Sequence, residues 1–423
     1  MMKKILFSII ALATVLSAVA GKKEQSDSQG KEDGVVEDYN RSSLYTFSIF
    51  NPGTEMAENI FSTLLKVQHP DRFNDHNLSL RVLSSKGNPK PDELKDQIAD
   101  FLDRNKIAQR LVSKWFNRDK TDGSFDMELI KERGNYNASV EDVNMALQTV
   151  RGKAMLEDAG EQLIGNTFVI VNDVSYVNKQ ARAEGVRAFF EALTMIGGAV
   201  AAANGGKNNT IKSIGQTGDA ISKLVAGFTV HIRSYLFRLV WNDSIASTFY
   251  TQCYYDKDHA DATKRRAYAL NSKLFRLEYV GNYEATSGKT VLRGLHKDEE
   301  VFLKVLTRAL DKNIVELRKK FEIFKITAPI FEIAADGTLH IHIGLKEGVE
   351  PTSKYEVLER REDEEGRITY HRKGIIRPVK DRIWDNRCMA TEEQADGAGL
   401  GFTTFEKVSG SDFYPGMLVR EIR

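Results

Sequence analysis

Two short stretches of this sequence bring histidine close to other side chains that bind metals or transfer protons. His69, Asp71, Asp75 and His76 fall within one loop. Two carboxylates and two imidazoles so close together resemble the ligand set of a hydrolytic metal centre. Loops are rich in these residue types, however, and Asp71 is followed directly by Arg72. An Asx-type turn is therefore the alternative interpretation of this loop.

The second candidate is a pair of histidines, His340 and His342, two residues apart in a predicted strand. Side chains at this spacing project from one face of a strand, as metal ligands in β-structure can. The sequence places no third ligand of suitable type beside them. The alternative interpretation is that both histidines are exposed strand residues that bind no metal.

Other catalytic motifs are missing from the sequence. It contains no G-x-S-x-G, H-E-x-x-H, C-x-x-C or EF-hand pattern. Gly288-Lys289-Thr290 resembles the end of a phosphate-binding loop, but the upstream Gly281 has the wrong spacing. No catalytic residue and no cofactor are predicted.

Cys253 and Cys388 are the two cysteines of the chain. Two cysteines exclude a disulfide framework and a cysteine-based zinc site. A single bridge between them stays open in an oxidising compartment, because spacing in sequence does not fix their distance in space. Two buried, unpaired thiols are the favoured interpretation.

The first 20 residues have the pattern of a secretory signal peptide. Lys3 and Lys4 precede an apolar run from Ile5 to Leu16, and Ala18-Val19-Ala20 is a small-x-small cleavage site. The apolar run is shorter than the roughly 20 residues of a transmembrane helix. Cleavage after Ala20 is predicted. Lipidation needs a cysteine directly after the cleavage site, and this position is Gly21, so lipidation is not expected. Residues 21–41 are polar and almost without large apolar side chains, which predicts a disordered tether.

The composition beyond this point is that of a globular protein. The chain has 423 residues, 41% of them hydrophobic, which is enough for two or three cores. Its 60 basic and 59 acidic residues are interleaved and leave a net charge of +1. Nucleic acid is therefore excluded as a predicted partner, because phosphate binding needs a concentrated basic face.

Residues 42–321 are predicted to form an α/β domain whose sheet is covered by helices. A β-bulge, or burial on both faces, is expected in the run 228–241, because its apolar positions change parity. Strand, helix and strand across 125–171 predict a right-handed βαβ crossover. Predicted strands cover residues 42–50, 77–83, 125–132, 167–171, 228–241, 249–255 and 274–279. Predicted helices cover residues 56–67, 91–115, 139–164 and 298–321.

A Gly/Ala-rich helical insertion is predicted near residues 182–224, and it can divide this domain into two subdomains. Its apolar run is too short to span a bilayer, so a packed helix is the favoured interpretation. Contact with a membrane surface is the alternative.

Residues 322–423 are predicted to form a mainly β domain, a small barrel or a sandwich. Its predicted strands cover residues 323–333, 339–344, 354–358, 368–371, 374–379 and 413–422. Gly397, Gly399 and Gly401 are predicted to lie in a loop. The fold class of the whole chain is thus α/β or α+β with a C-terminal β domain.

Local stretches of the chain resemble a known group of proteins. The segment from Phe125 to Val171, with its Glu132-Arg133-Gly134 turn, resembles exported α/β domains of curli-secretion and flagellar-assembly type. Gly348-Val349-x-Pro351, Tyr355-Glu356-Val357 and the closing Pro415 to Val419 resemble a small barrel in such assembly proteins. As a whole, the chain resembles an uncharacterised family of exported bacterial cell-envelope proteins, and this resemblance implies no catalytic residue.

The sequence therefore predicts a non-catalytic protein-interaction or assembly component of the cell envelope, in the periplasm or associated with the outer membrane. Its predicted partners are other envelope proteins. One alternative is an exported hydrolase that uses the loop from His69 to His76. Another is an outer-membrane secretion or pore subunit with membrane strands in Phe228 to Tyr255, although their faces do not alternate cleanly between lipid and water.

Overall fold

The computed structural model describes most of the chain beyond residue 41. The described residues are 42–54, 56–70, 73–76, 78, 82–84, 89–134, 160–176, 225–292, 298–325, 327–362, 368–390 and 400–422. The predicted signal peptide (1–20), tether (21–41) and Gly/Ala-rich insertion (182–224) lie outside the described residues, as does most of the predicted helix 139–164.

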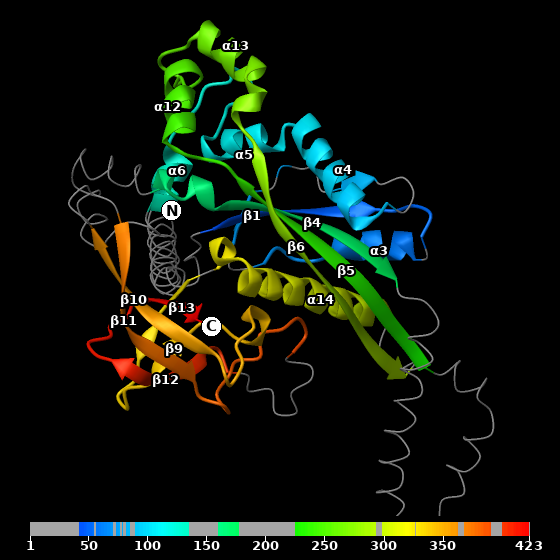
Figure 1. The fold of residues 1–423 in the computed structure, drawn as a ribbon, viewed down its shortest axis with the longest axis vertical. Helices are drawn as coiled ribbons and strands as arrows, with labels where there is room; N and C mark the ends of the chain where they lie inside the picture. Colours follow the sequence, from blue (N-terminus) through cyan, green and yellow to red (C-terminus); the bar gives the residue numbers. More distant parts are fainter. Residues whose placement is uncertain are drawn as a thin grey trace, which may run out of the picture.

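A mixed sheet forms the centre of the N-terminal part (Figure 1). Its strand order is β2 (Asn74–Asp75), β1 (Ser43–Phe50), β4 (Thr167–Tyr176), β5 (Val225–Leu239) and β6 (Leu277–Leu292), and β3 (Val82–Ser84) also pairs with β1. Strand β1 runs parallel to β2, β3 and β4, whereas β5 is antiparallel to both β4 and β6. The strand-forming segments are rich in β-branched and aromatic residues, which suit a pleated, packed surface.

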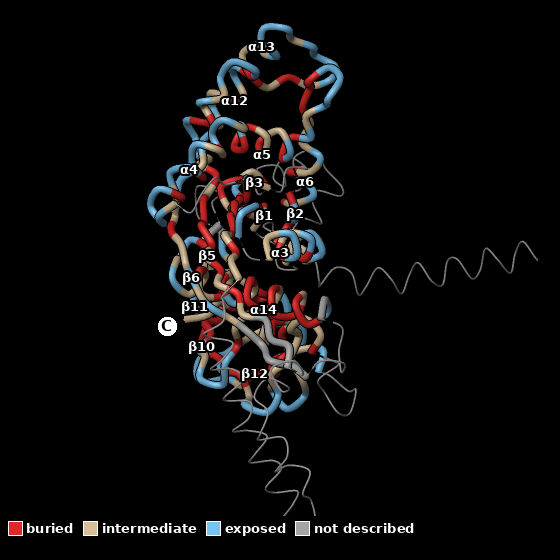
Figure 2. Tube along the Cα trace, turned by 90° about the vertical axis from the view of Figure 1, so that its right-hand side faces the viewer, coloured by how far each residue is buried: buried red, intermediate tan, exposed pale blue. Residues whose placement is uncertain are grey.

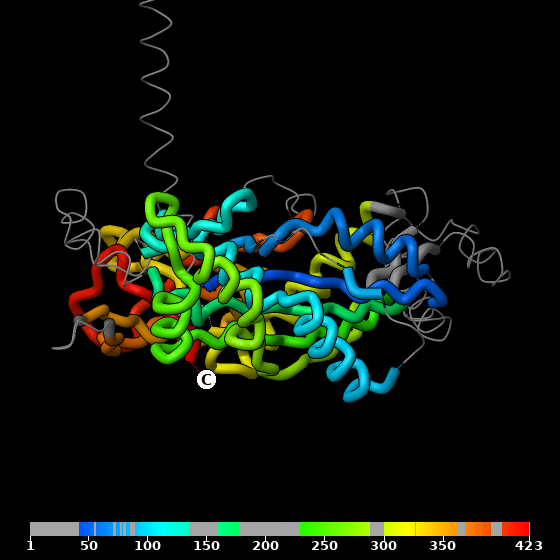
Figure 3. The backbone as a smooth tube through the Cα atoms, turned by 90° about the horizontal axis from the view of Figure 1, so that it is seen from above, coloured from blue at the N-terminus to red at the C-terminus, as the bar shows by residue number. Residues whose placement is uncertain are grey.

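Helices cover both faces of this sheet. On one face, α4 (Pro91–Arg104) and α5 (Ile107–Trp115) pack their apolar stripes against Phe47, Val169 and Phe237. On the other face lie α3 (Ala57–Leu64) and α14 (Asp298–Lys320). Figure 3 shows α3 and α4 on opposite sides of the strands. Buried residues gather on the strands, α5 and α14, whereas α13 (Ala262–Leu270) at the far end is mostly exposed (Figure 2).

In the run 228–241, the apolar residues change from one alternating set of positions to the other, and both of the expected causes of this change are present. The pairing of β5 with β6 shifts in register between Leu236 and Phe237, as at a β-bulge. Residues 234–237 are also buried on both faces, between the two helical layers. The extra twist of a bulge and the double burial together explain the continuous apolar sequence there.

Two predicted strands are helices instead. The predicted strand 125–132 overlaps α6 (Glu128–Gly134), so the unit 125–171 does not begin with a strand. The predicted strand 249–255 overlaps α12 (Asp243–Gln252). Asn242 caps α12 because its side-chain oxygen accepts from the Ile245 amide at 3.0 Å. The aromatic residues that suggested a strand pack instead into the core around Phe249, with Phe249 and Tyr250 on α12 and Tyr254 and Tyr255 just after it.

The predicted helix 91–115 is broken into α4 and α5. Lys106 adopts a left-handed conformation with φ of 52°, which ends the regular helix between them. The apolar stripe continues across the break, so the periodicity gave no sign of it. The predicted helix 298–321, in contrast, is confirmed as α14.

The C-terminal part is a seven-stranded antiparallel half-barrel sheet with its own core. Its strand order is β7 (Ala328–Pro329), β13 (Leu418–Ile422), β10 (Lys354–Glu362), β11 (Ile368–Pro378), β12 (Thr403–Gly410), β9 (Leu339–Ile341) and β8 (Glu332–Ile333). The predicted mainly β structure is confirmed, with a curled sheet. Strand β12 was not predicted, because its outer half, Glu406–Gly410, is polar or exposed.

The two edges of the half-barrel sheet meet at one chain segment. Strands β7 and β8 are the two ends of residues 328–333. Between them, the Ile330 amide donates to the Met417 carbonyl at 2.8 Å, and the Phe331 amide donates to the His340 carbonyl at 2.9 Å. This segment therefore bonds to both sides of the curled sheet, which covers its edges.

Helix α14 joins the two parts of the molecule. One of its faces packs on β5 and β6, and its residues also contact the half-barrel region. Arg308 Nε donates to the Cys388 carbonyl at 3.0 Å, and Lys319 pairs with Glu350 at 3.0 Å. Val315 lies directly against Gly348, which follows the 3₁₀ turn η4 (Leu345–Glu347). No helix among the described residues is both long and apolar enough to cross a membrane.

Candidate functional site

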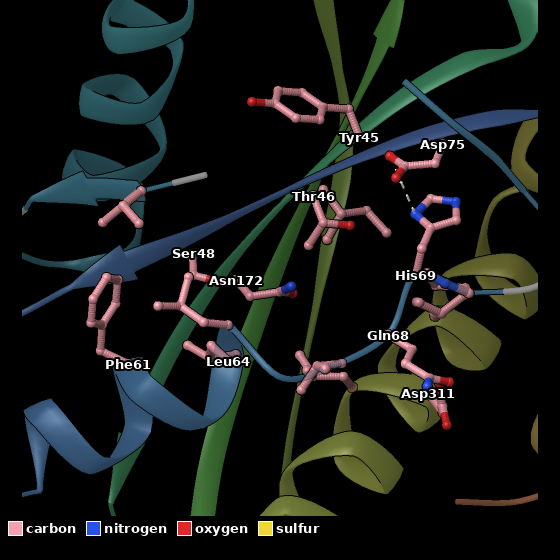
Figure 4. A pocket seen from close by; sticks show the side chains of 17 residues that line it. Tyr45, Thr46, Ser48, Phe61, Leu64, Gln68, His69, Asp75, Asn172 and Asp311 are labelled. Atoms are coloured by element: carbon pink, nitrogen blue, oxygen red, sulfur yellow. Dashed lines mark ion pairs between the residues drawn. The ribbon is translucent and has the colours of Figure 1, made fainter. Parts of the chain in front are cut away.

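A small pocket lies where α3 and α14 meet the central strands β1 and β4 (Figure 4). Its cavity volume is about 100 Å³. Apolar side chains from α3, β3 and α14 form much of its wall. Its polar lining residues are Thr46, Ser48, Gln68, His69, Asp75, Asn172 and Asp311.

Polar residues in the middle of two strands form the floor of the pocket. In β1, Tyr45 and Phe47 are buried against the α4–α5 layer, whereas Thr46 and Ser48 on the opposite face are only partly buried. Strand β4 contributes Asn172, which is 4% exposed. Buried hydroxyl and amide groups on central strands destabilise the fold unless they are hydrogen-bonded. Their presence at the pocket floor is therefore typical of a binding site that supplies polar partners.

A buried hydrogen-bond chain fixes Asn172. Ser234 Oγ donates to Asn172 Oδ1 at 2.7 Å, and Asn313 Nδ2 donates to Ser234 Oγ at 3.0 Å. Asn313 Nδ2 also donates to the Ile232 carbonyl at 3.1 Å. With its oxygen held by Ser234, the Asn172 side chain is restrained in one orientation at the pocket floor.

Two residues of the predicted metal loop, His69 and Asp75, line this pocket together. Their closest atoms, Nδ1 and Oδ1, are 3.8 Å apart. His69 Nε2 donates to the Phe73 carbonyl at 2.9 Å. Ser48 lines the same pocket, but the imidazole nitrogen that would accept a serine proton is the one bonded to Phe73. This geometry does not form a nucleophilic triad.

The third predicted residue, His76, is separated from the pocket. Its ring is fully buried and lies 5.0 Å from the Trp115 ring, measured between centroids. Neither of its nitrogens has a hydrogen-bond partner among the described residues. Burial, and then the positive charges of Arg133 and Lys114 and the nearby His69, lower the pKa of His76 well below its usual value. A buried, neutral imidazole of this kind has no access to a substrate.

Asp71, the fourth residue of that loop, lies outside the described residues. Within the described part of the chain, no group of three or more His, Cys, Asp or Glu side chains is arranged to hold a metal ion.

In the predicted pair, His340 lies in β9, whereas His342 follows the end of that strand, and each ring has different neighbours. His340 Nδ1 lies 3.0 Å from Glu332 Oε2, and its ring stacks on Phe402. His342 Nδ1 lies 3.1 Å from the Gly401 carbonyl. The two imidazoles therefore take part in separate surface contacts.

Both cysteines are free thiols in the structure. Cys253 is buried in the aromatic core beside α12, and burial raises the pKa of its thiol. Cys388 is partly buried, and its carbonyl is bonded to Arg308 of α14.

A second feature concerns the edge of the N-terminal sheet. Strand β6 spans 16 residues and pairs with β5 on one side. Among the described residues, no strand pairs with its other side. At the opposite edge of the sheet, the described residues form the short strands β2 and β3. An unpaired strand edge of this length presents a row of backbone donors and acceptors.

Five polar lining residues were not predicted from the sequence: Thr46, Ser48, Gln68, Asn172 and Asp311. They come from two strands, a helix and the segment after α3, most of which are far apart in the chain. One signal was available in the sequence. Asn172 and Asp173 directly follow the buried run Thr167 to Val171 and lie inside β4, where apolar residues are expected.

A comparison with models of known protein families and a search among curated proteins found no match for this chain. The arguments on function therefore come from the site and the fold.

Proposed function

We propose that this protein is an exported, non-catalytic component of the cell envelope that binds another protein by adding a strand to the outer edge of β6. The observation that carries the proposal is the 16-residue length of this edge strand. Strand addition uses backbone hydrogen bonds for affinity and alternate side chains for specificity. A long edge supplies many such bonds at once.

The contrast between the two sheets supports this assignment. Proteins usually shorten or cover strand edges, because exposed edges pair with other chains. The half-barrel does so with the segment 328–333, which bonds to Met417 and His340. The N-terminal sheet leaves its longest strand at an edge. Within the described residues, one pair of edges is thus covered and a longer edge is left open, which suits binding through the open edge.

The candidate chemical groups support a non-catalytic role. His76 is buried against Trp115, and His69 donates to a backbone carbonyl through Nε2. The hydrolase alternative needs an accessible general base in this loop. The pore alternative needs membrane strands in Phe228 to Tyr255, but residues 243–252 of that range form helix α12.

Site-specific photo-cross-linking in the native host tests the binding edge. A benzoylphenylalanine at Thr286, which is exposed on β6, is expected to give one dominant adduct. Thr286 is preferred to Asn282, whose carbonyl already accepts from Lys320 at 3.2 Å. The matched control is Lys257, which is exposed in the loop between α12 and α13. Mass spectrometry of the adduct identifies the partner and distinguishes a second copy from a different protein.

Either of two results would contradict the proposal that the outer edge of β6 binds another protein. Either Thr286 gives no adduct, or Thr286 and Lys257 give the same set of adducts. The second result would mean that the probe at β6 reports only random collisions.

Export is tested separately by fractionation of the host and mass spectrometry of the N-terminus. We expect the protein in the envelope fractions, beginning at Gly21, because the small residues Ala18 and Ala20 suit signal peptidase. An Ala20→Leu variant is expected to accumulate as the uncleaved precursor. Wild-type protein that keeps its first residues and stays in the cytoplasm would contradict export while leaving the β6 proposal open to its own test.

A further inference from the structure

The outer edge of β6 is guarded at one position. The Asn282 carbonyl accepts a hydrogen bond from Lys320 Nζ at 3.2 Å, and Lys320 is exposed at the end of α14. A lysine at a strand edge is a common protection against pairing with another chain. Glu284 and Thr286, further along β6, are exposed and lie beyond this guard.

The backbone groups of Thr286 are directed to the outer edge. The Val240 amide, just after β5, donates to the Arg276 carbonyl at 3.1 Å, so even-numbered residues of β5 direct their backbone groups toward β6. The extra residue of the bulge lies in β6, which leaves the alternation along β5 unbroken, and Ile232 pairs with Ala285 beyond it. Because backbone groups alternate between the two sides of a strand, those of Thr286 and of every second residue from it point outward.

The side chains beside this stretch of edge are held by β5. Arg233 Nε donates to Glu284 Oε2 at 2.6 Å, and His231 Nδ1 lies 3.3 Å from Thr286 Oγ1. The negative charge of Glu284 is therefore balanced by Arg233 and directed toward β5, away from the outer edge. A further strand can approach this edge without burying an unpaired charge.

The sequence around Thr286 is complementary to itself in an antiparallel pair. With Thr286 of one copy opposite Thr286 of a second copy, Glu284 lies opposite Gly288 and Ala285 lies opposite Ser287. No like charges face each other over residues 284–288, and Thr–Thr pairs are favourable across strands. Each hydrogen-bonded pair exchanges two bonds, so the three pairs formed by residues 284, 286 and 288 give about six backbone hydrogen bonds.

Two other outward-directed positions are poorer centres for a symmetric pair. A pair centred on Glu284 would place two carboxylates opposite each other, which is destabilising. A pair centred on Asn282 would have to displace Lys320 in both copies. Thr286 is therefore the favoured centre among these three positions.

We propose that the partner bound at the outer edge of β6 is a second copy of this chain, with the two β6 strands antiparallel and centred on Thr286. This inference rests on the proposed function, because it uses the same edge. Both copies contribute the same surface, as in the two-fold dimers that are the commonest oligomers. The two N-terminal sheets then form one continuous sheet.

Sedimentation equilibrium of the purified protein tests self-association. We expect a monomer–dimer equilibrium. Thr286→Pro removes an outward amide that β5 does not use, and edge strands tolerate proline. This variant is expected to keep the wild-type circular dichroism spectrum and to raise the dimer dissociation constant about tenfold or more. Thr286→Ala is the matched control, because it keeps the amide, and it is expected to dimerise nearly like the wild type.

Disulfide formation tests the register of the pair. Opposite residues of a hydrogen-bonded antiparallel pair have Cα atoms about 5.5 Å apart, within the range that a disulfide spans. Thr286→Cys, combined with Cys388→Ser, is therefore expected to form an intermolecular disulfide with copper phenanthroline about tenfold or more faster than Glu278→Cys in the same background. Glu278 is the matched control, because it is exposed on the same strand but far from Thr286.

Three results would overturn self-pairing through β6: a protein that stays monomeric, a dimer that Thr286→Pro leaves unchanged, or equal rates of disulfide formation at positions 286 and 278. The photo-cross-linking experiment at Thr286 separates these failures from failure of the proposed function. An adduct with a different protein would keep the β6 edge as a binding site while the second-copy proposal fails. Absence of any adduct, together with a monomeric protein, would contradict both.

Discussion

Gly348→Ala is expected to lower the free energy of unfolding by about 2–4 kcal/mol. Gly348 has φ of +80°, a left-handed conformation in which a side chain is strained. An added Cβ would also lie 2.4 Å from Val315 Cγ1, and valine has little rotamer freedom in a helix. The substitution therefore combines backbone strain with overpacking at the contact between α14 and the half-barrel. Urea unfolding at neutral pH measures the loss.

Gly337→Ala is the matched control for this prediction. Gly337 has φ of +82°, but nothing lies within 4 Å of an added Cβ. It is expected to show the backbone strain alone, about 1–2 kcal/mol. Combining Gly348→Ala with Val315→Ala is expected to recover part of the loss, as a double-mutant cycle would reveal. Equal destabilisation by the two glycine variants would show that the Val315 contact contributes nothing.

The second large effect concerns pH. Stability is expected to fall by up to about 1.4 kcal/mol per pH unit as the pH drops below about 6.5. Burial, Arg133, Lys114 and His69 lower the pKa of His76 in the folded protein. The unfolded chain then takes up a proton near its ordinary pKa while the folded chain does not. The contribution of His76 is thus fully present above about pH 6.5 and is lost progressively below it.

Removing the titrating group isolates its share of this slope. His76→Phe keeps a ring against Trp115 and is expected to flatten the stability curve between pH 7.5 and 5.5. The matched control is His259→Gln, since the side chain of His259 is 82% exposed. It is expected to leave the slope close to that of the wild type. If the His76 variant and the wild type lose the same stability over this range, then His76 is not the group responsible.

The local pattern of apolar residues correctly predicted the main strands of the N-terminal sheet and helix α14. The alternation in β1 and the buried run in β4 predict strands because half or all of their side chains must pack on helices. Apolar spacing over one turn after another likewise predicts α14, which rests on β5 and β6. In these elements, the hydrophobicity of each side chain matches its burial, so the local sequence pattern indicates the structure.

In other elements, contacts with segments that are distant in the chain determine the structure. The aromatic segment 249–255 has the composition of a strand, but Asn242 caps a helix and Phe249 fits the core from that helix. Strand β12 has an exposed outer half and is held by pairing with β11 and β9. Such elements depend on contacts between distant segments, which local periodicity does not contain.

The candidate site was predictable only in part. His69 and Asp75 belong to one loop and do meet. His76 is adjacent to Asp75 but is buried against Trp115, as expected when successive residues of an extended segment point to opposite sides. The remaining polar groups arrive from β1, β4 and α14, and the sequence gives no distance between these elements.

The segment 328–333 has a consequence for the order of folding. Residues 329 and 330 bond to residues 416–418, which are made much later in synthesis, and Phe331 bonds to His340. Contacts so distant in sequence form slowly, because a long loop must close first. During synthesis, the half-barrel therefore stays incomplete until β13 has been made, because residues 329 and 330 have no partners until then.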